Sequence, residues 1–153
     1  NKKGEGMAFM VLDDRSGRIE VAVFADRFRD NREKIVKDAL LVVEGQVSED
    51  DYTGGFKMRA DKVQTLYEAR QAYIKGITLD LGREHLNGQR GGAELSRILE
   101  PFRSGRCPVM VRYRGREATG QVRLSPDWAV YPEDELLHRL RESYGFNAVQ
   151  LEY

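Results

Sequence analysis

Few side chains in this chain have the type and spacing that catalysis or metal binding requires. The two histidines, His85 and His138, lie far apart and have no further histidine or cysteine at a metal-ligand spacing. The single cysteine, Cys107, stands beside Pro108 at the start of an expected strand, and no histidine is placed to activate it. We therefore expect no catalytic residue, no bound metal and no cofactor.

Acidic and glycine-rich stretches favour turns over reactive centres. Glu49-Asp50-Asp51 leads directly into the turn formers at 52–55, and Asp13-Asp14 leads into a similar turn ending at Gly17. The glycine-rich residues 88–92 precede an expected helix, whose first backbone N–H groups could bind a phosphate. Because this stretch lacks the lysine and the hydroxyl of a nucleotide-binding loop, a plain loop is the simpler interpretation.

The remaining candidates are cations and aromatic rings that could bind the phosphates and bases of a single-stranded nucleic acid. The cations are Lys2, Lys3, Arg15, Arg18, Lys57 and Arg59. Tyr52 and Phe56 are candidate stacking residues, although we expect Phe56 to point inward with Met58. Acidic side chains surround these positions, so we expect weak and salt-sensitive binding.

The elements that must position these residues form two groups, which we expect to be separate domains over 1–70 and 71–153. In the first, strands are expected over 7–12, 18–24, 40–48 and 56–66, and a helix over 26–39 lies between the second and the third strand in the sequence. We expect the strand at 7–12, apolar throughout, to be covered on both sides. The order strand–strand–helix–strand–strand, with glycines at the corners, predicts an OB-fold β-barrel. Such a barrel has five strands, so we expect its first strand to precede Asn1 and the barrel to be open.

The second group predicts a small α+β domain. Strands are expected over 74–81, 108–113, 117–124 and 146–153, with helices over 93–102 and from Pro132 to Tyr144. The order β-α-β-β-α-β is that of a ferredoxin-like, split βαβ arrangement.

Charge and hydropathy restrict the function classes. The 25 basic and 25 acidic residues cancel, so any nucleic-acid binding is expected to be local. One cysteine, no apolar run of about 18–20 residues and no signal-peptide pattern predict a cytoplasmic protein without membrane contact. Over residues 103–123 the second group has a single acidic residue, Glu117, and six arginines: Arg103, Arg106, Arg112, Arg114, Arg116 and Arg123. They form either a solvated basic hairpin or a docking patch for an acidic partner or phosphate.

Several motifs, in order along nearly the whole chain, resemble the C-terminal region of the alpha subunit of bacterial DNA polymerase III. They are Lys2-Lys3-Gly4, Met7-Ala8-Phe9, the stretch 12–21, Val43-Glu44-Gly45-Gln46-Val47, Gly54-Gly55-Phe56-Lys57-Met58, Trp128-Ala129-Val130-Tyr131-Pro132 and Leu136-Leu137-His138-Arg139-Leu140. The pattern Phe9-x-x-Leu12-Asp13-Asp14-x-x-Gly17 within these motifs is also similar to the anticodon-binding OB domains of class II aminoacyl-tRNA synthetases.

The resemblance to the polymerase subunit implies a division of labour. Its OB domain is associated with single-stranded template DNA, contacted by basic residues that correspond to Lys2 and Lys3. Its last domain binds the tau subunit of the clamp loader in the replisome; the residues we expect at that contact are Trp128, Tyr131, Phe146, Leu151 and Tyr153. The catalytic aspartates and the other polymerase domains, which would be further partners, lie outside this chain, so we expect no polymerase activity. An RNA- or tRNA-binding OB module, and a purely structural interaction fragment, remain alternatives.

Overall fold

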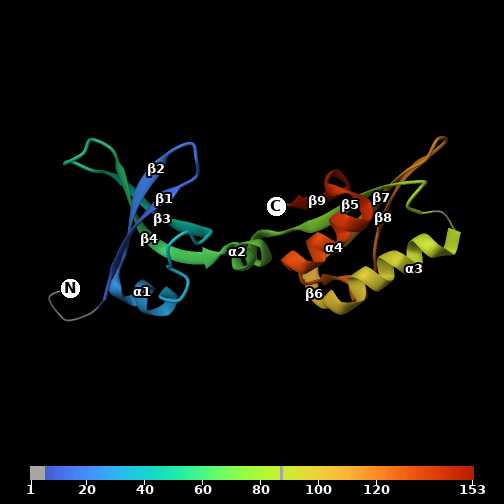
Figure 1. Cartoon of the computed structure of the whole chain (residues 1–153), viewed down its shortest axis with the longest axis horizontal. Coiled ribbons are helices and arrows are strands. Elements are labelled where there is room, and N and C mark those ends of the chain that lie inside the picture. The colour runs from blue at the N-terminus through green and yellow to red at the C-terminus, as the bar shows by residue number, and fades with distance from the viewer. Residues whose placement is uncertain (1–5, 87) are drawn as a thin grey trace. The chain divides into compact units, whose positions relative to one another are not determined.

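The computed structural model describes residues 6–86 and 88–153 (Figure 1). The chain divides into two compact units, Asn1–Leu66 and Tyr67–Tyr153, which we call the N-terminal and C-terminal units. None of the helices in the described residues is long and apolar enough to cross a membrane.

The N-terminal unit is a four-stranded sheet with one short helix. Its elements are β1 (Ala8–Asp13), β2 (Arg18–Val23), α1 (Ala25–Asn31), β3 (Leu41–Glu49) and β4 (Phe56–Thr65). The strand order is β1-β2-β4-β3, with antiparallel β1–β2 and β3–β4 pairs and a parallel β2–β4 pair. Within the described residues β1 and β3 are the edges of this sheet, and the fifth strand of the OB barrel stays a prediction.

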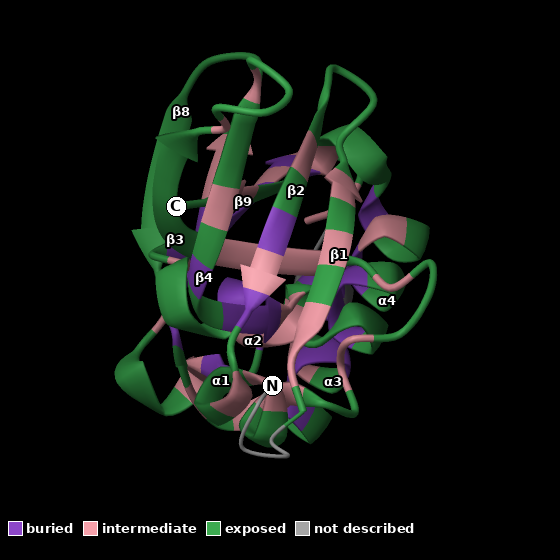
Figure 2. Cartoon of the chain, turned by 90° about the vertical axis from the view of Figure 1, so that its left-hand side faces the viewer, coloured by how far each residue is buried: buried purple, intermediate pink, exposed green. Residues whose placement is uncertain are grey.

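One face of this sheet forms the core of the N-terminal unit. Val21, Val23, Ala60 and Val63 are buried there, and Phe28 of α1 packs against them. Alternate residues of β1 face this core, whereas Phe9 and Val11 are exposed, so the strand shows alternating bands of exposure (Figure 2). The expectation that β1 is covered on both sides is therefore wrong, because an apolar run does not reveal which of its faces has a partner.

Local chemistry explains the turns and the bend of the N-terminal unit. Asp14 Oδ1 accepts hydrogen bonds from the backbone N–H groups of Ser16 and Gly17 at 2.9 and 3.0 Å, as the turn prediction requires. At Gly45 the register between β3 and β4 shifts, and an added Cβ there would lie 2.1 Å from the Arg59 carbonyl oxygen.

Helix α1 is shorter than the predicted helix over 26–39. It ends at Asn31, whose carbonyl oxygen accepts the N–H groups of both Lys34 and Ile35 and so closes a turn. Asp38 then takes a positive φ of 63°, which no helix continues through. Ile35 still packs against the core, so the apolar pattern correctly indicated a buried residue although the helix does not extend to it.

The C-terminal unit is a second four-stranded sheet backed by two helices. Its elements are α2 (Leu66–Tyr73), β5 (Gly76–Gly82), α3 (Gly88–Leu99), η1 (Glu100–Phe102), β6 (Arg103–Cys107), β7 (Val109–Arg114), β8 (Thr119–Arg123), η2 (Pro126–Trp128), α4 (Asp134–Tyr144), η3 (Phe146–Ala148) and β9 (Val149–Glu152). The apolar residues of α3 and α4 form one core with the inward-facing residues of β5, β7 and β9.

The strand order of the second sheet corrects the ferredoxin-like prediction. The order is β8-β7-β5-β9, with β7 parallel to β5 and directly paired with it, whereas a split βαβ unit holds another strand between the two. The two strands of the β7–β8 hairpin differ in burial: β7 contributes the buried Val109 and Val111, while every residue of β8 is exposed. The more apolar strand takes the central place, and the polar one becomes the edge.

Candidate nucleic-acid interface

The side of the N-terminal sheet that faces away from the core carries a mixed basic and apolar surface. Residues directly opposite one another in neighbouring strands share a face, so the register defines this surface. One row across the four strands is Phe9, Ala22, Arg59 and Gln46, and the next is Val11, Glu20, Lys57 and Ser48. Asp13 and Arg18 extend it at the turn end. We call these ten residues the outer face.

Three of the six predicted cations, Arg18, Lys57 and Arg59, lie together on the outer face. Each also has a carboxylate close by: Asp13 is 2.8 Å from Arg18, Asp50 is 3.3 Å from Lys57, and Asp61 is 3.7 Å from Arg59. These pairs are solvent-exposed, and such pairs contribute only about 0–1 kcal/mol. A phosphate can therefore compete for the cations at little cost.

Two of these three carboxylates, those of Asp13 and Asp50, stabilise turns. The pKa of Asp13 lies below its ordinary value because the carboxylate accepts the Arg15 N–H and is bonded to Arg18. Asp50 also has a lowered pKa, chiefly through the hydroxyl of Thr53, which donates to it at 2.6 Å. Both groups are therefore ionised at neutral pH and offset the positive charge of the cations beside them.

The other predicted binding residues lie elsewhere. Arg15 is in the β1–β2 turn at a φ of 71°, beyond the end of the outer face. Tyr52 is 95% exposed in the β3–β4 turn. Phe56 shares a face with Met58, as expected, but lies at the strand end and remains 65% exposed. Lys2 and Lys3 lie outside the described residues.

Phe9 is the functional candidate that sequence reasoning missed. Its ring is 64% exposed on the outer face, Val11 beside it on the same strand is 62% exposed, and its cross-strand neighbour is the small Ala22. An exposed aromatic ring next to cations is the combination that single-strand-binding OB folds use. The two-residue period of a strand could have indicated this exposure: because Ala8, Met10 and Leu12 face the core, Phe9 must face outward.

The residues expected at the partner contact of the C-terminal unit lie on three segments. Trp128 ends η2, packs partly against the core and holds the Arg103 guanidinium 4.4 Å from its ring centroid. Phe146 in η3 is 71% exposed beneath the Arg141 guanidinium, 4.5 Å away. Tyr131 and Tyr153 are also exposed.

Leu151 differs from these exposed rings. It lies on β9, an edge strand, and packs against the core. It therefore supports the edge strand rather than presenting a free side chain.

The residues that could support other chemistry have ordinary structural surroundings. His85 Nδ1 accepts the Gly82 N–H at 3.3 Å, and His138 Nε2 lies 3.3 Å from Glu142. Burial raises the pKa of the Cys107 thiol to about 11, which keeps it protonated and unreactive. In the described part of the chain no three histidine, cysteine or acidic side chains gather where they could hold a metal ion.

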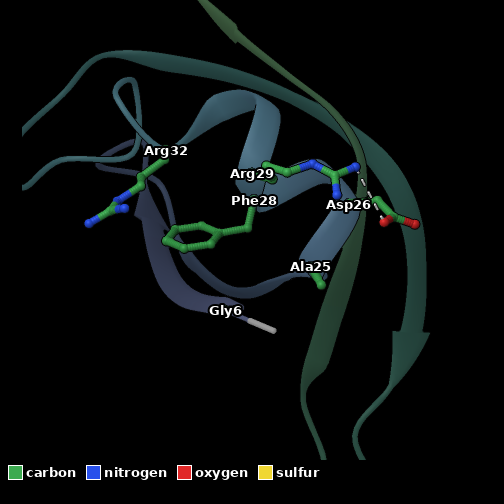
Figure 3. Close-up of a pocket in the computed structure, with 6 residues that line it drawn as sticks. All are labelled: Gly6, Ala25, Asp26, Phe28, Arg29 and Arg32. Carbon is green, nitrogen blue, oxygen red and sulfur yellow. Dashed lines mark ion pairs between the residues drawn. The ribbon is translucent and has the colours of Figure 1, made fainter. Parts of the chain in front are cut away.

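A hollow of about 340 Å³ beside α1 is lined by Gly6, Ala25, Asp26, Phe28, Arg29 and Arg32 (Figure 3). Arg29 lies 3.7 Å from both Asp26 and Asp30, so its charge is partly offset. The ring of Phe28 is part of the core of the N-terminal unit. The hollow therefore does not define a ligand by itself.

Comparison with known proteins identifies the class of the N-terminal unit. Residues 1–66 match the family description "OB-fold nucleic acid binding domain". Together with the sheet and its outer face, this match defines the unit as an OB-fold domain.

Matches over the C-terminal unit and over the whole chain identify a more specific family. Residues 94–145 match "DNA polymerase III subunit alpha, C-terminal domain". The chain is 40% identical over 152 residues to DNA polymerase III subunit alpha of Escherichia coli K12, covering 99% of this chain. It is 39% identical over 155 residues to that of Pseudomonas aeruginosa, covering all of it, and 39% identical over 152 residues to that of Vibrio cholerae. The resemblance to the C-terminal region of the DNA polymerase III alpha subunit is thus confirmed. The chain spans 13% of the length of these relatives.

Proposed function

We propose that this chain is a non-catalytic part of a replicative DNA polymerase alpha subunit, with single-stranded DNA and the tau subunit of the clamp loader as its partners. In this proposal the N-terminal unit binds DNA weakly, and the C-terminal unit is the protein-interaction domain. The remaining polymerase domains are partners within the same subunit, which acts in the cytoplasm. The observation that carries the DNA-binding part is the outer face, where three cations and an exposed aromatic ring lie together on an OB-fold sheet.

The charges of the outer face set the expected strength of binding. Each cation that neutralises a phosphate of single-stranded DNA adds about 0.7 to the salt dependence of log K, so Arg18, Lys57 and Arg59 together contribute about 2. Asp13, Glu20 and Asp61 lie among or beside them, which keeps the affinity low. Binding should therefore be measurable at about 50 mM salt and largely lost at about 200 mM.

Fluorescence anisotropy with a labelled single-stranded oligonucleotide tests this proposal. The triple variant Arg18→Ser/Lys57→Ser/Arg59→Ser should lower the affinity and reduce the salt slope by about 2. A matched triple variant, Arg27→Ser/Arg29→Ser/Arg32→Ser, removes the same charge from exposed positions on and just after α1, off the outer face. Equal losses in the two triple variants would contradict a specific outer-face site.

Competition with transfer RNA tests the alternative that the N-terminal unit is a tRNA-binding OB module. We expect the single-stranded DNA to compete at least as well as the tRNA. Tight binding of tRNA with no binding of DNA would overturn the replication proposal in favour of that alternative.

The tau contact is assigned to the exposed aromatic side chains near the end of the C-terminal unit. Phe146→Ala and Tyr153→Ala should weaken binding to a tau fragment in a pull-down or by calorimetry, because both rings are exposed and their loss leaves the core intact. Trp128→Ala should also weaken it, but this ring packs partly against the core, so circular dichroism must show that the variant folds. Unchanged tau affinity in all three folded variants would exclude this surface.

The non-catalytic assignment has a direct test. A primed-template extension assay with this chain and all four nucleotides should show no incorporation above buffer. Incorporation that depends on protein concentration would refute it.

A further inference from the structure

A second group of cations lies in the C-terminal unit, where its two parallel strands end. β5 and β7 pair in register with Gly82 opposite Arg114 at their carboxyl ends. An open hollow of about 470 Å³ lies here, lined by Arg83, Glu84, Arg114, Gly115 and Arg116. Because β5 and β7 are parallel, the loop that follows β5 and the turn between β7 and β8 lie at the same edge of the sheet.

The described lining of the hollow holds three arginines and a single acidic residue, Glu84. Glu84 is turned back toward its own loop: its oxygen lies 3.4 Å from His85 Nδ1 and beside Gly82. The side chains of Arg83 and Arg116 form no ion pair or hydrogen bond with any residue that the structure describes. The net charge of the lining is therefore positive, and two of its cations have no internal counterion there.

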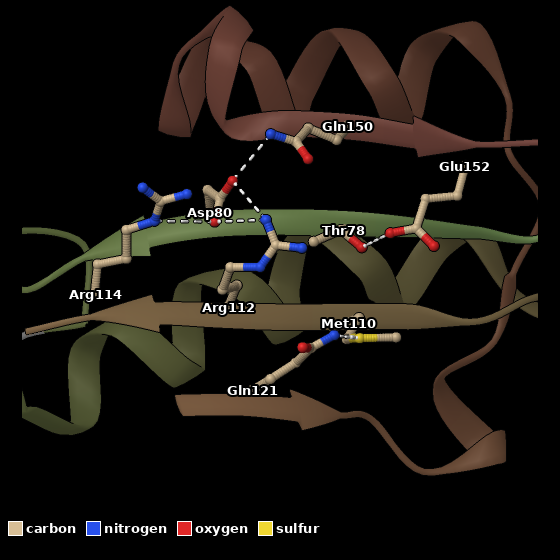
Figure 4. A network of polar contacts seen from close by, with 8 residues as sticks. All are labelled: Thr78, Asp80, Met110, Arg112, Arg114, Gln121, Gln150 and Glu152. Atoms are coloured by element: carbon tan, nitrogen blue, oxygen red, sulfur yellow. Dashed lines mark hydrogen bonds and ion pairs between the residues drawn. The ribbon is translucent and has the colours of Figure 1, made fainter. Parts of the chain in front are cut away.

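Arg114 is oriented toward the hollow by a carboxylate behind it. Its Nε lies 3.5 Å from Asp80 Oδ1 (Figure 4). Asp80 Oδ2 also lies 3.3 Å from Arg112 Nη1 and accepts a hydrogen bond from Gln150 Nε2 at 3.0 Å. The side chain of Asp80 is only 14% exposed, whereas that of Arg114 is 66% exposed. Because Asp80 engages Nε, the two terminal nitrogens of Arg114 remain available to a ligand. Asp80 is thus a positioning residue.

The chemistry of the lining selects the ligand. Among the residues that the structure describes, no apolar or aromatic side chain lines the hollow, so it offers no apolar surface for an acyl chain. A guanidinium binds phosphate through a planar, bidentate fork. Three such forks, two from loops and one from the end of β7, suit a phosphate, whose oxygens point in several directions, better than a planar carboxylate.

We propose that this hollow is a phosphate-binding site, formed by Arg83, Arg114 and Arg116 and separate from the outer face of the OB-fold unit. Of the two partners left open for the arginine-rich hairpin, the geometry favours phosphate over an acidic protein. The phosphates come either from a nucleic-acid backbone or from a small polyphosphate.

The experiment uses the full chain carrying the outer-face triple variant, so that the OB-fold unit does not obscure the second site. Two probes are titrated: inorganic triphosphate by calorimetry, and a labelled oligonucleotide of abasic sites by anisotropy. Arg83→Ser/Arg116→Ser should abolish triphosphate binding. If the oligonucleotide binds, the same change should reduce its salt slope by about 1.4, or about sevenfold in affinity between 50 and 200 mM salt.

Two further variants make the test specific. Arg97→Ser/Arg106→Ser removes the same charge from exposed positions that do not line the hollow, and binding should change little. Arg114→Lys keeps the charge but removes the fork, so it should weaken binding at least threefold; an unchanged affinity would show that no bidentate contact exists.

The possible results distinguish the two sources of phosphate, and they distinguish this proposal from the proposal for the outer face. Binding of triphosphate alone identifies a small polyphosphate, and tighter binding of the oligonucleotide identifies a nucleic-acid backbone. Equal losses in the Arg83/Arg116 and Arg97/Arg106 variants overturn the site, as does binding of an oligoglutamate peptide with neither phosphate probe. None of these results depends on whether the outer face binds DNA, because that face is disabled throughout.

Discussion

Replacing Phe9 by alanine separates base stacking from charge on the outer face. The ring is 64% exposed, and its neighbour across β2 is the small Ala22, so a base can lie against it without displacing another side chain. One base–aromatic stack is worth about 1–3 kcal/mol. Phe9→Ala should therefore weaken single-stranded DNA binding by about 5- to 150-fold. The salt slope should stay unchanged, because no cation is lost.

The chain offers a matched control for this variant. Phe56 is 65% exposed but shares the opposite face of the sheet with Met58. Phe56→Ala removes an equally exposed ring and should leave DNA affinity within about twofold. Thermal melts by circular dichroism should show similar small changes in stability for both, since neither ring is in the core.

An abasic oligonucleotide completes the test. Without bases there is nothing to stack, so Phe9→Ala should have no effect on its affinity. The reasoning is refuted if Phe9→Ala weakens the abasic and the normal oligonucleotide equally, or if Phe56→Ala costs as much as Phe9→Ala.

Three further predictions concern the fold. Gly45→Ala should lower the stability of the N-terminal unit by about 1–3 kcal/mol in denaturant titrations, because its Cβ would lie 2.1 Å from a backbone oxygen, whereas Gly17→Ala, with open space, should not. The pKa of Asp14 is lowered below 3.8, chiefly by the Ser16 hydroxyl, so its contribution to stability is present above that pH and is lost as the pH falls through the lower folded value. Melts should accordingly show the N-terminal unit weakening below about pH 4, and less so in Asp14→Asn; an identical pH profile would contradict this. Cys107, with its pKa raised to about 11, should resist iodoacetamide at pH 8 until the protein is denatured; rapid alkylation of the folded chain would show that the thiol is accessible.

Features decided by neighbouring residues could be predicted from the sequence. The Asp14 turn follows from hydrogen bonds between residues two and three positions apart. The same is true of most strands of both units, whose apolar periods are continuous. Arg18, Lys57 and Arg59 were candidates because their charge is visible in the sequence, although their DNA-binding role stays a prediction.

Features that depend on distant partners could not be predicted in this way. The place of β7 beside β5 depends on which strand of the hairpin buries more apolar surface against α3 and α4. The exposure of Phe9 depends on which face of β1 meets the core. The approach of Arg83 to Arg114 depends on the parallel register of β5 and β7.

The sequence by itself therefore determined the strands, the turns, the kind of charge available and the relationship to the polymerase subunit. Only the tertiary structure decided which side chains share a surface, because a strand has two faces and a sheet can order its strands in several ways. Burial against a core chooses among these arrangements, and that choice placed Phe9 with the cations of one sheet and three arginines around the end of the other.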